Sequence, residues 1–136
     1  MAGAGEVIER HIEAFNSRDA AAEPWAEDAE MVAPGASVDG REAVLGFLGV
    51  FQEAFPDGRL EIKRLLAEGD AAAVEGSFAG THDGVLHSPA GDVAPTGRRV
   101  DFRWAAAYRV RDAELLSEHL YFDQMEFLGQ LGLLPD

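Results

Sequence analysis

Two neighbouring stretches decide the fold of this chain: residues 100–110 read VDFRWAAAYRV, and residues 115–123 read LLSEHLYFD. In both stretches apolar side chains alternate with polar or small ones, which is the period-2 pattern of a strand with one buried face. The few residues between them are enough for a tight turn. We therefore predict two long antiparallel strands on which Glu118 lies opposite Tyr108 or Ala106.

Three more strands are predicted upstream. Residues 59–64 and 71–81 alternate in the same way, and residues 30–33 form a short strand that ends at Pro34. Residues 83–97 are rich in Gly, Pro, Ser and Asp, so we expect a long loop there, of the kind that forms the rim or lid of a site. This order of elements favours a curved antiparallel sheet wrapped over helices.

Helical spacing of apolar residues predicts the second layer, beginning at the N-terminal end. Residues 7–15 are expected to form an amphipathic helix with one apolar stripe. Asp19 then has the chemistry of an N-cap, so we predict a short second helix that runs toward Trp25.

Two capped helices complete the predicted set. Residues 39–42, DGRE, have the spacing of a capping box with Asp39 as the N-cap, and an apolar stripe continues from there to Phe55. A closing helix is predicted at residues 124–131, with Asp123 as its N-cap.

The composition restricts the class of protein. The 136 residues suit one domain spanning residues 1–136, and 47% are hydrophobic, which is enough to fill a core. The formal net charge of −14, from 25 acidic against 11 basic residues, argues against a protein that binds nucleic acid or anionic lipid. There is no cysteine, no apolar run of about 20 residues for a membrane span and no pattern of a signal peptide, so a cytoplasmic protein is expected.

Glu118 is the anomaly of the second long strand, because the same face of that strand otherwise carries Leu and Phe side chains. An unpaired buried charge is too costly to persist, so we expect Glu118 to be hydrogen-bonded, with Tyr108 as the obvious partner, to have a raised pKa, or to open onto a wet cavity. One interpretation is a general acid or base in an apolar pocket, and the other is a structural Glu–Tyr pair.

His82, at the end of a predicted strand, is a second candidate. It either moves protons near neutral pH or only caps the loop that follows it. The four histidines show no H-x-x-x-H spacing, so no metal site is expected. The sequence also lacks the motifs of a serine hydrolase elbow and of nucleotide-binding loops.

Four short motifs resemble those of the SnoaL-like polyketide cyclase family: AFPD at residues 54–57, GTHDG at 80–84, PTGR at 95–98 and QLG at 130–132. The resemblance covers nearly the whole chain and ends at Pro135. It implies the NTF2-like fold, an α+β cone in which a curved antiparallel sheet wraps over N-terminal helices and encloses an apolar pocket. It also implies chemistry without a metal or an organic cofactor.

The chain departs from the cyclases at three positions. Their catalytic Asp falls on Leu120, their pocket His falls near Ala106, and their pocket Asn falls near Phe47. A leucine cannot transfer a proton, so the aldol mechanism of the cyclases does not carry over.

We therefore predict a protein that binds a small apolar or aromatic, polyketide-like molecule, with cyclase-like or isomerase-like chemistry at Glu118 assisted by Tyr108 or His82. The alternatives are a non-catalytic ligand-binding protein and a dimerisation module of the same fold. In each case the opposite face of the sheet, with Arg103 and His119, is expected to be solvated or to pack in a homodimer. The residues expected to shape the pocket are Phe15, Trp25, Phe47, Phe51, Phe102, Trp104, Leu120 and Phe122.

Overall fold

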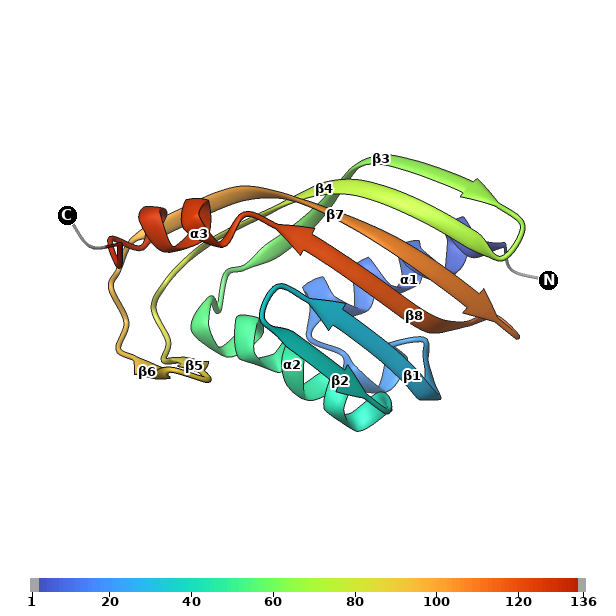
Figure 1. Ribbon diagram of the computed structural model, residues 1–136, viewed down its shortest axis with the longest axis horizontal. Coiled ribbons are helices and arrows are strands. Elements are labelled where there is room, and N and C mark those ends of the chain that lie inside the picture. Colours follow the sequence, from blue (N-terminus) through green and yellow to red (C-terminus); the bar gives the residue numbers. More distant parts are fainter. Residues whose placement is uncertain (1–2, 135–136) are drawn as a thin grey trace.

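The computed structural model describes residues 3–134 and shows a curved sheet lying over a layer of helices (Figure 1). Pro135, the last residue of the predicted resemblance, lies outside the described residues. None of the helices in the described part is long and apolar enough to cross a membrane. The helices of this part are α1 (Ala4–Ser17), α2 (Arg41–Ala54) and α3 (Gln124–Gln130), and η1 (Ala20–Ala22) is a single 3-10 turn. Its strands are β1 (Trp25–Ala33), β2 (Ala36–Asp39), β3 (Arg59–Glu68), β4 (Ala71–Thr81), β5 (Leu86–Ser88), β6 (Gly91–Val93), β7 (Arg99–Arg111) and β8 (Glu114–Phe122).

The main sheet is open and has the strand order β2-β1-β8-β7-β4-β3. Neighbouring strands are antiparallel except β1 and β8, which run parallel. The sheet is therefore mixed, whereas the sequence predicted an antiparallel one. These two strands are far apart in the sequence, and side-chain alternation does not encode the direction of such a pairing. The curvature of the sheet carries β4, β7 and β8 over α1 and α2 (Figure 1).

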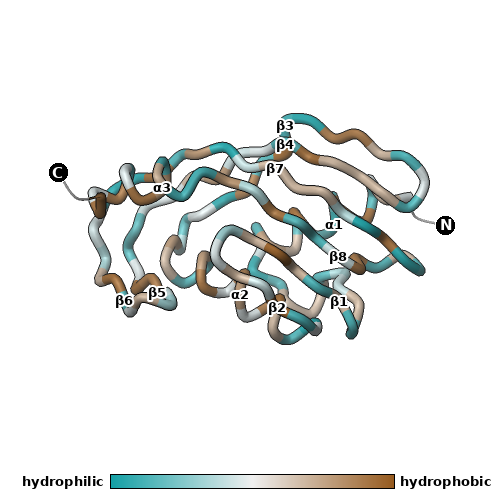
Figure 2. Tube along the Cα trace, viewed as in Figure 1, coloured by the Kyte–Doolittle hydropathy of each residue, from teal (hydrophilic) through white to brown (hydrophobic). Residues whose placement is uncertain are grey.

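One face of the sheet packs on the helices and holds the core. Along β7, Phe102, Trp104, Ala106 and Tyr108 are buried while the alternate residues are exposed, as the alternation predicts. The same alternation of apolar and polar residues is visible along the strands in Figure 2. Gly76 on β4 lies opposite Trp104, and a Cβ there would lie 2.5 Å from the indole, so the missing side chain lets the ring lie against the sheet.

The chain between α1 and β1 differs from its predicted structure. The expected second helix is only the turn η1, in which the Asp19 carboxylate accepts a hydrogen bond from the Ala22 amide. β1 therefore begins at Trp25, five residues before the predicted strand.

Two other segments also differ from the prediction. Gly40, without a side-chain cap, is the N-cap of α2, because Asp39 is still the last residue of β2. The expected loop at residues 83–97 contains a two-stranded hairpin of β5 and β6. This hairpin lies beside the C-terminal end of α2 (Figure 1).

Two predictions that bear on the site are confirmed. Tyr108 of β7 lies directly opposite Glu118 of β8 in the register of the antiparallel pair. Asp123 caps α3, because its carboxylate accepts hydrogen bonds from the amides of Met125 and Glu126 at 2.9 and 3.2 Å. The cap ends β8 just after Phe122 and fixes where α3 leaves the sheet.

Candidate functional site

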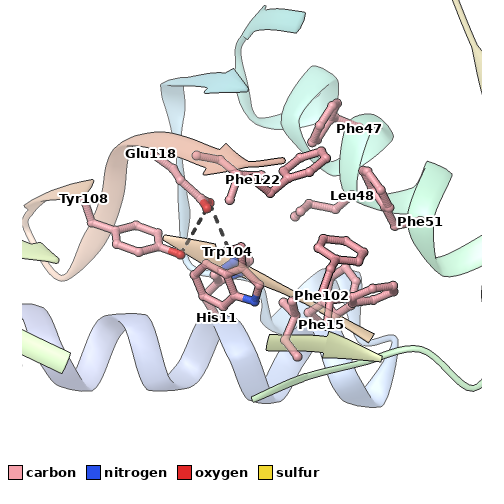
Figure 3. A pocket seen from close by; sticks show the side chains of 13 residues that line it. His11, Phe15, Phe47, Leu48, Phe51, Phe102, Trp104, Tyr108, Glu118 and Phe122 are labelled. Atoms are coloured by element: carbon pink, nitrogen blue, oxygen red, sulfur yellow. Dashed lines mark hydrogen bonds and ion pairs between the residues drawn. The ribbon is translucent and has the colours of Figure 1, made fainter. Parts of the chain in front are cut away.

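A cavity of about 50 Å³ lies between the inner face of the sheet and the helices α1 and α2 (Figure 3). Its walls are almost entirely aromatic and aliphatic, and the ionisable groups in them come from His11, Tyr108 and Glu118. The lining residues are His11, Phe15, Phe47, Leu48, Phe51, Leu60, Phe78, Phe102, Trp104, Tyr108, Glu118, Leu120 and Phe122.

Glu118 is the carboxylate of this cavity. Its side chain is buried, with 3% of the residue exposed, and its Oε2 accepts a hydrogen bond from the Tyr108 hydroxyl at 3.1 Å. The other oxygen, Oε1, has no hydrogen-bond partner among residues 3–134. Burial raises the pKa of Glu118 above its usual value of 4.5, although the nearby His11 charge and the Tyr108 hydrogen bond oppose this shift. A carboxyl group with a raised pKa can both take up and release a proton closer to neutral pH.

His11 reaches the same end of the cavity from α1 and forms a buried pair with Glu23. The His11 Nδ1 and Glu23 Oε1 atoms are 2.6 Å apart, and Trp25 Nε1 donates to the same oxygen at 3.2 Å. Burial by itself lowers the pKa of His11, but the hydrogen bond and charge of Glu23, together with the charge of Glu118, raise it above 6.5. Glu23 thus fixes the ring orientation and favours the imidazolium.

Four buried side chains follow one another in space, from Glu23 behind the cavity wall to His11, Glu118 and Tyr108 in the wall. With Nδ1 bound to Glu23, the His11 Nε2 atom lies 3.9 Å from Glu118 Oε1, and Glu118 is in turn bonded to Tyr108. Figure 3 shows Tyr108 and His11 converging on the Glu118 carboxylate. Two carboxylates, one imidazole and one phenol therefore lie close together in the buried interior.

The Tyr108 and Trp104 side chains supply hydrogen-bond donors to the cavity wall. Burial, followed by the charge of Glu118, raises the pKa of Tyr108 well above 10, so the phenol stays protonated. Trp104 Nε1 is buried and finds no hydrogen-bond acceptor in the described part of the chain, and the same residue lines the cavity. The wall thus combines an acceptor that has no partner, on Glu118, with a donor that has none.

The structure brings together most of the side chains that the sequence predicted for the site. Glu118 and Tyr108 share the cavity with all of the predicted pocket residues except one. The exception is Trp25, which packs edge-on against the His11 ring at 5.3 Å and bonds Glu23 behind the cavity wall. Those that line the cavity are Phe15, Phe47, Phe51, Phe102, Trp104, Leu120 and Phe122.

His82 lies outside the cavity. Its ring packs against Phe55 at 5.4 Å, and its Nδ1 accepts from the Thr96 amide at 3.1 Å with the Thr96 hydroxyl 2.9 Å away. Its backbone amide and carbonyl bond Arg98 and Gly97, which ties the start of the loop to its end. Burial lowers the pKa of His82, so the ring is a neutral part of the loop anchor. This geometry favours the capping alternative.

Sequence patterns did not single out His11 and Glu23. His11 sits in the apolar stripe of α1, where a histidine reads as core, and Glu23 follows a turn that looked like a continuing helix. Within residues 3–134 no group of three or more His, Asp or Glu side chains is arranged to hold a metal ion.

Comparison with solved structures identifies the fold. IdmH of Streptomyces antibioticus, a candidate polyketide cyclase, is 30% identical, with 94% of this chain and 97% of IdmH covered at a TM-score of 0.78. AclR of Streptomyces galilaeus, a candidate hydroxylase, is 25% identical, with coverage of 97% and 86% and a TM-score of 0.79. A Catenulispora acidiphila protein with a ketosteroid isomerase-like fold, solved with trimethylamine, is 21% identical, with coverage of 95% and 94% and a TM-score of 0.77.

One of two sequence comparisons identifies the family of this chain. A search of curated proteins found no match. The family model of the SnoaL-like domain matches residues 8–119, a span that runs from α1 into β8 and includes His11, Tyr108 and Glu118. Together with the curved sheet over its helices, this match shows that the chain belongs to the SnoaL-like family, whose structural neighbours have the ketosteroid isomerase-like, NTF2-like fold.

Proposed function

We propose that this protein binds a small hydrophobic or aromatic molecule of the polyketide type, and that Glu118 moves a proton on that molecule. The observation that carries the proposal is Glu118 Oε1, a buried carboxylate oxygen that has no hydrogen-bond partner among residues 3–134 and lies in a cavity with mostly apolar walls. Leaving such an atom unsatisfied costs about 1–3 kcal/mol. A ligand that donates a hydrogen bond or a proton to it removes that cost.

The proposed reaction is an internal proton transfer. Glu118 removes a proton from a carbon next to a carbonyl group and returns it to another atom of the same molecule, so that no proton is gained or lost overall. The Tyr108 hydroxyl holds the carboxylate in place through Oε2 and leaves Oε1 for the ligand. No metal or organic cofactor takes part in this scheme, which fits either an isomerase-like or a cyclase-like step.

Two further observations support a carboxylate at this place. The sequence resemblance aligns Leu120 with the catalytic Asp of the cyclases, and Glu118 lies two residues earlier on the same strand, so both side chains face the cavity. The related IdmH, at 30% identity, is a candidate polyketide cyclase.

A second candidate function is ligand binding without turnover. It is favoured by the Tyr108–Glu118 hydrogen bond, which already satisfies one carboxylate oxygen, and by the leucine at position 120. In that case the cavity selects a ligand by shape, and the charge of Glu118 contributes little beyond one hydrogen bond.

A thermal-shift screen of the wild type and Glu118→Gln against planar aromatic and polyketide-like compounds tests both candidates. Each compound is recovered afterwards and analysed by mass spectrometry and chromatography. The matched control is Glu114→Gln, which neutralises an exposed carboxylate on the same strand. Conversion by the wild type and the control, but not by Glu118→Gln, supports proton transfer. A saturable shift in all three proteins without conversion favours the binding function, and no shift with any compound contradicts both.

We also propose that the chain forms a homodimer through the outer face of the sheet. One residue from each of the strands β1, β8, β7, β4 and β3 lies in a row across this face, in the order Val32, His119, Ala107, Ala73 and Leu66. The two ends of the row are exposed apolar side chains, with Val32 at 40% and Leu66 at 61% exposure. The middle of the row holds Ala107 and Ala73, which leave the surface flat enough for a second copy. A cytoplasmic location stays a prediction.

A further inference from the structure

The size of the cavity limits what it can hold. An apolar cavity that binds a benzene molecule has a volume of about 150 Å³, whereas the cavity beside Glu118 measures about 50 Å³. It therefore has room for a polar head group, but a complete aromatic ring needs more space. A ligand of the proposed kind must extend beyond the cavity.

A groove of about 350 Å³ adjoins the cavity at the end of the molecule where the β5–β6 hairpin and α3 lie. Apolar residues dominate its walls, including Leu86, Val93 and Phe127. Within the described range, 3–134, no Asp, Glu, Lys or Arg lines it, although a quarter of the chain is charged. The Ser88 hydroxyl and the Gln124 amide in its wall already donate to backbone carbonyls, so the groove suits an apolar occupant.

Phe47 of α2 and Phe122 of β8 line both the cavity and the groove. They are therefore the partition between the two spaces, and both are only partly buried. Phe51 packs against each of them, with ring centroids 5.6 Å from Phe47 and 6.4 Å from Phe122. Rotation of either partition ring would join the cavity to the groove.

Two glycines lie close to Phe47 in the helix α2. Gly46 and Gly49 lie in the interior of α2, and a Cβ added at either position would meet nothing within 4 Å. Packing therefore does not require glycine there, while each glycine weakens the helix by about 1 kcal/mol relative to alanine. This pliable stretch carries one half of the partition.

We propose that the cavity and the groove are one binding site for an elongated amphiphile, with a hydroxyl or carbonyl head in the cavity and an apolar tail in the groove. The tail passes between Phe47 and Phe122. The head matches the donor on Trp104 and the acceptor on Glu118 that have no partners. Together the two spaces fall within the roughly 300–1,000 Å³ of ordinary small-molecule sites. This inference rests on the proposed function and deepens it by stating the shape of the ligand.

The test is calorimetric titration with phenol and its 4-ethyl, 4-butyl and 4-hexyl derivatives. Their hydroxyl group is small enough for the cavity, the ring would lie between Phe47 and Phe122, and the alkyl chain would lie in the groove. Three proteins are compared: the wild type, Ala90→Trp, which fills the groove from an exposed wall position, and Ala21→Trp, which adds the same side chain on the exposed turn η1. Affinities are expressed relative to that of phenol for the same protein. We expect the wild type and Ala21→Trp to gain about twofold to fourfold in affinity per added methylene, and Ala90→Trp to lose this gain.

The outcomes separate the inference from the function on which it rests. If phenol binds but longer chains bring no gain, or if Ala90→Trp gains as much as the wild type, the tail does not lie in the groove and the inference is wrong. If no member of the series binds to any of the three proteins, the proposed binding function fails as well. A gain that disappears only in Ala90→Trp supports the inference.

Discussion

Nε2 of His11 lies 3.9 Å from Oε1 of Glu118 at the end of the cavity where α1 faces β8. This distance is too long for a direct hydrogen bond, yet both side chains are almost fully buried. Each has its own second partner, Glu23 for His11 and Tyr108 for Glu118. The two groups therefore sense each other by charge, and a polar atom of a ligand can interact with both.

Glu23→Gln is expected to lower the pKa of His11. The carboxylate of Glu23 provides the hydrogen bond and the largest charge that raise this pKa, and without them the effect of burial dominates. The free energy of unfolding near neutral pH should fall by about 1–3 kcal/mol, because a charge-assisted hydrogen bond between buried groups is weakened.

An NMR titration of the histidine Cε1 protons measures this change directly. The matched control is Glu27→Gln, which neutralises an exposed carboxylate four residues further along the chain. An identical His11 titration in Glu23→Gln and in the control would contradict the role given to Glu23.

Glu118→Gln is expected to flatten the pH dependence of stability. The pKa values of His11 and Glu118 are both raised in the folded protein, so the folded state holds these protons more tightly than the unfolded chain. The resulting stability is complete below pH 4.5 for Glu118 and below pH 6.5 for His11, and is lost as the pH rises through each folded value. The wild type should therefore become less stable as the pH rises above 4.5, and further as it rises above 6.5.

Urea titrations across this range compare the two proteins. Glutamine keeps an acceptor for Tyr108 but carries no buried charge, so at a pH where Glu118 of the wild type is ionised the variant should exceed the wild type by about 1 kcal/mol in the free energy of unfolding. Glu114→Gln is the control, since its carboxylate is exposed. Parallel curves for Glu118→Gln and the wild type would show that Glu118 does not change its charge in this range.

The pairing of Tyr108 with Glu118 could be predicted from the sequence because both residues lie on consecutive strands. Alternation decides which face each side chain occupies, so the sequence limits the partners of Glu118 to a few residues on the facing strand. A bulge between Arg109 and Val110 then shifts the register by one residue and sets the exact pair, and the sequence pattern does not show this bulge. The aromatic wall of the cavity followed from the same rule, since Phe102 and Trp104 share a face with Tyr108. Local periodicity is sufficient wherever the contacts are between neighbouring strands.

The meeting of His11 with Glu23 could not be predicted in the same way. It depends on how the chain leaves α1, passes through one 3-10 turn and enters β1, and helical periodicity contains no information on that path. The parallel pairing of β1 with β8 has the same origin, because it joins segments separated by most of the chain. His82 was predicted as a candidate because histidine chemistry is visible in a sequence, while its burial under Phe55 is not.

Gly46→Ala and Gly49→Ala are expected to stabilise the protein and to slow the entry of ligands. Each new methyl group meets no atom within 4 Å, so the gain in helix propensity, about 0.5–1 kcal/mol, is not offset by a clash. A stiffer α2 should move Phe47 aside less often, which lowers the association rate more than the affinity.

Urea denaturation and stopped-flow binding of 4-hexylphenol measure the two effects. Gly76→Ala is the contrasting variant, since its Cβ would lie 2.5 Å from the Trp104 ring and 2.6 Å from the Glu61 carbonyl oxygen, and it should lose stability. An unchanged association rate in both α2 variants would mean that ligands do not enter past Phe47.

The outer face of the sheet provides the last prediction, which concerns assembly. Leu66 and Tyr121 on this face are 61% and 63% exposed, and a symmetric dimer would bury both on each copy. Replacing both with glutamate adds four like charges to that interface in a protein whose net charge is already −14. We expect sedimentation equilibrium to give a mass twice that of the chain for the wild type and a dissociation constant at least about tenfold higher for the double variant.

Met125→Glu is the control, because Met125 is as exposed, at 65%, but lies on α3 away from the sheet face. A wild type that sediments as a single chain would contradict the proposed dimer, and so would a double variant that stays dimeric, because the paired strands would then not form the interface.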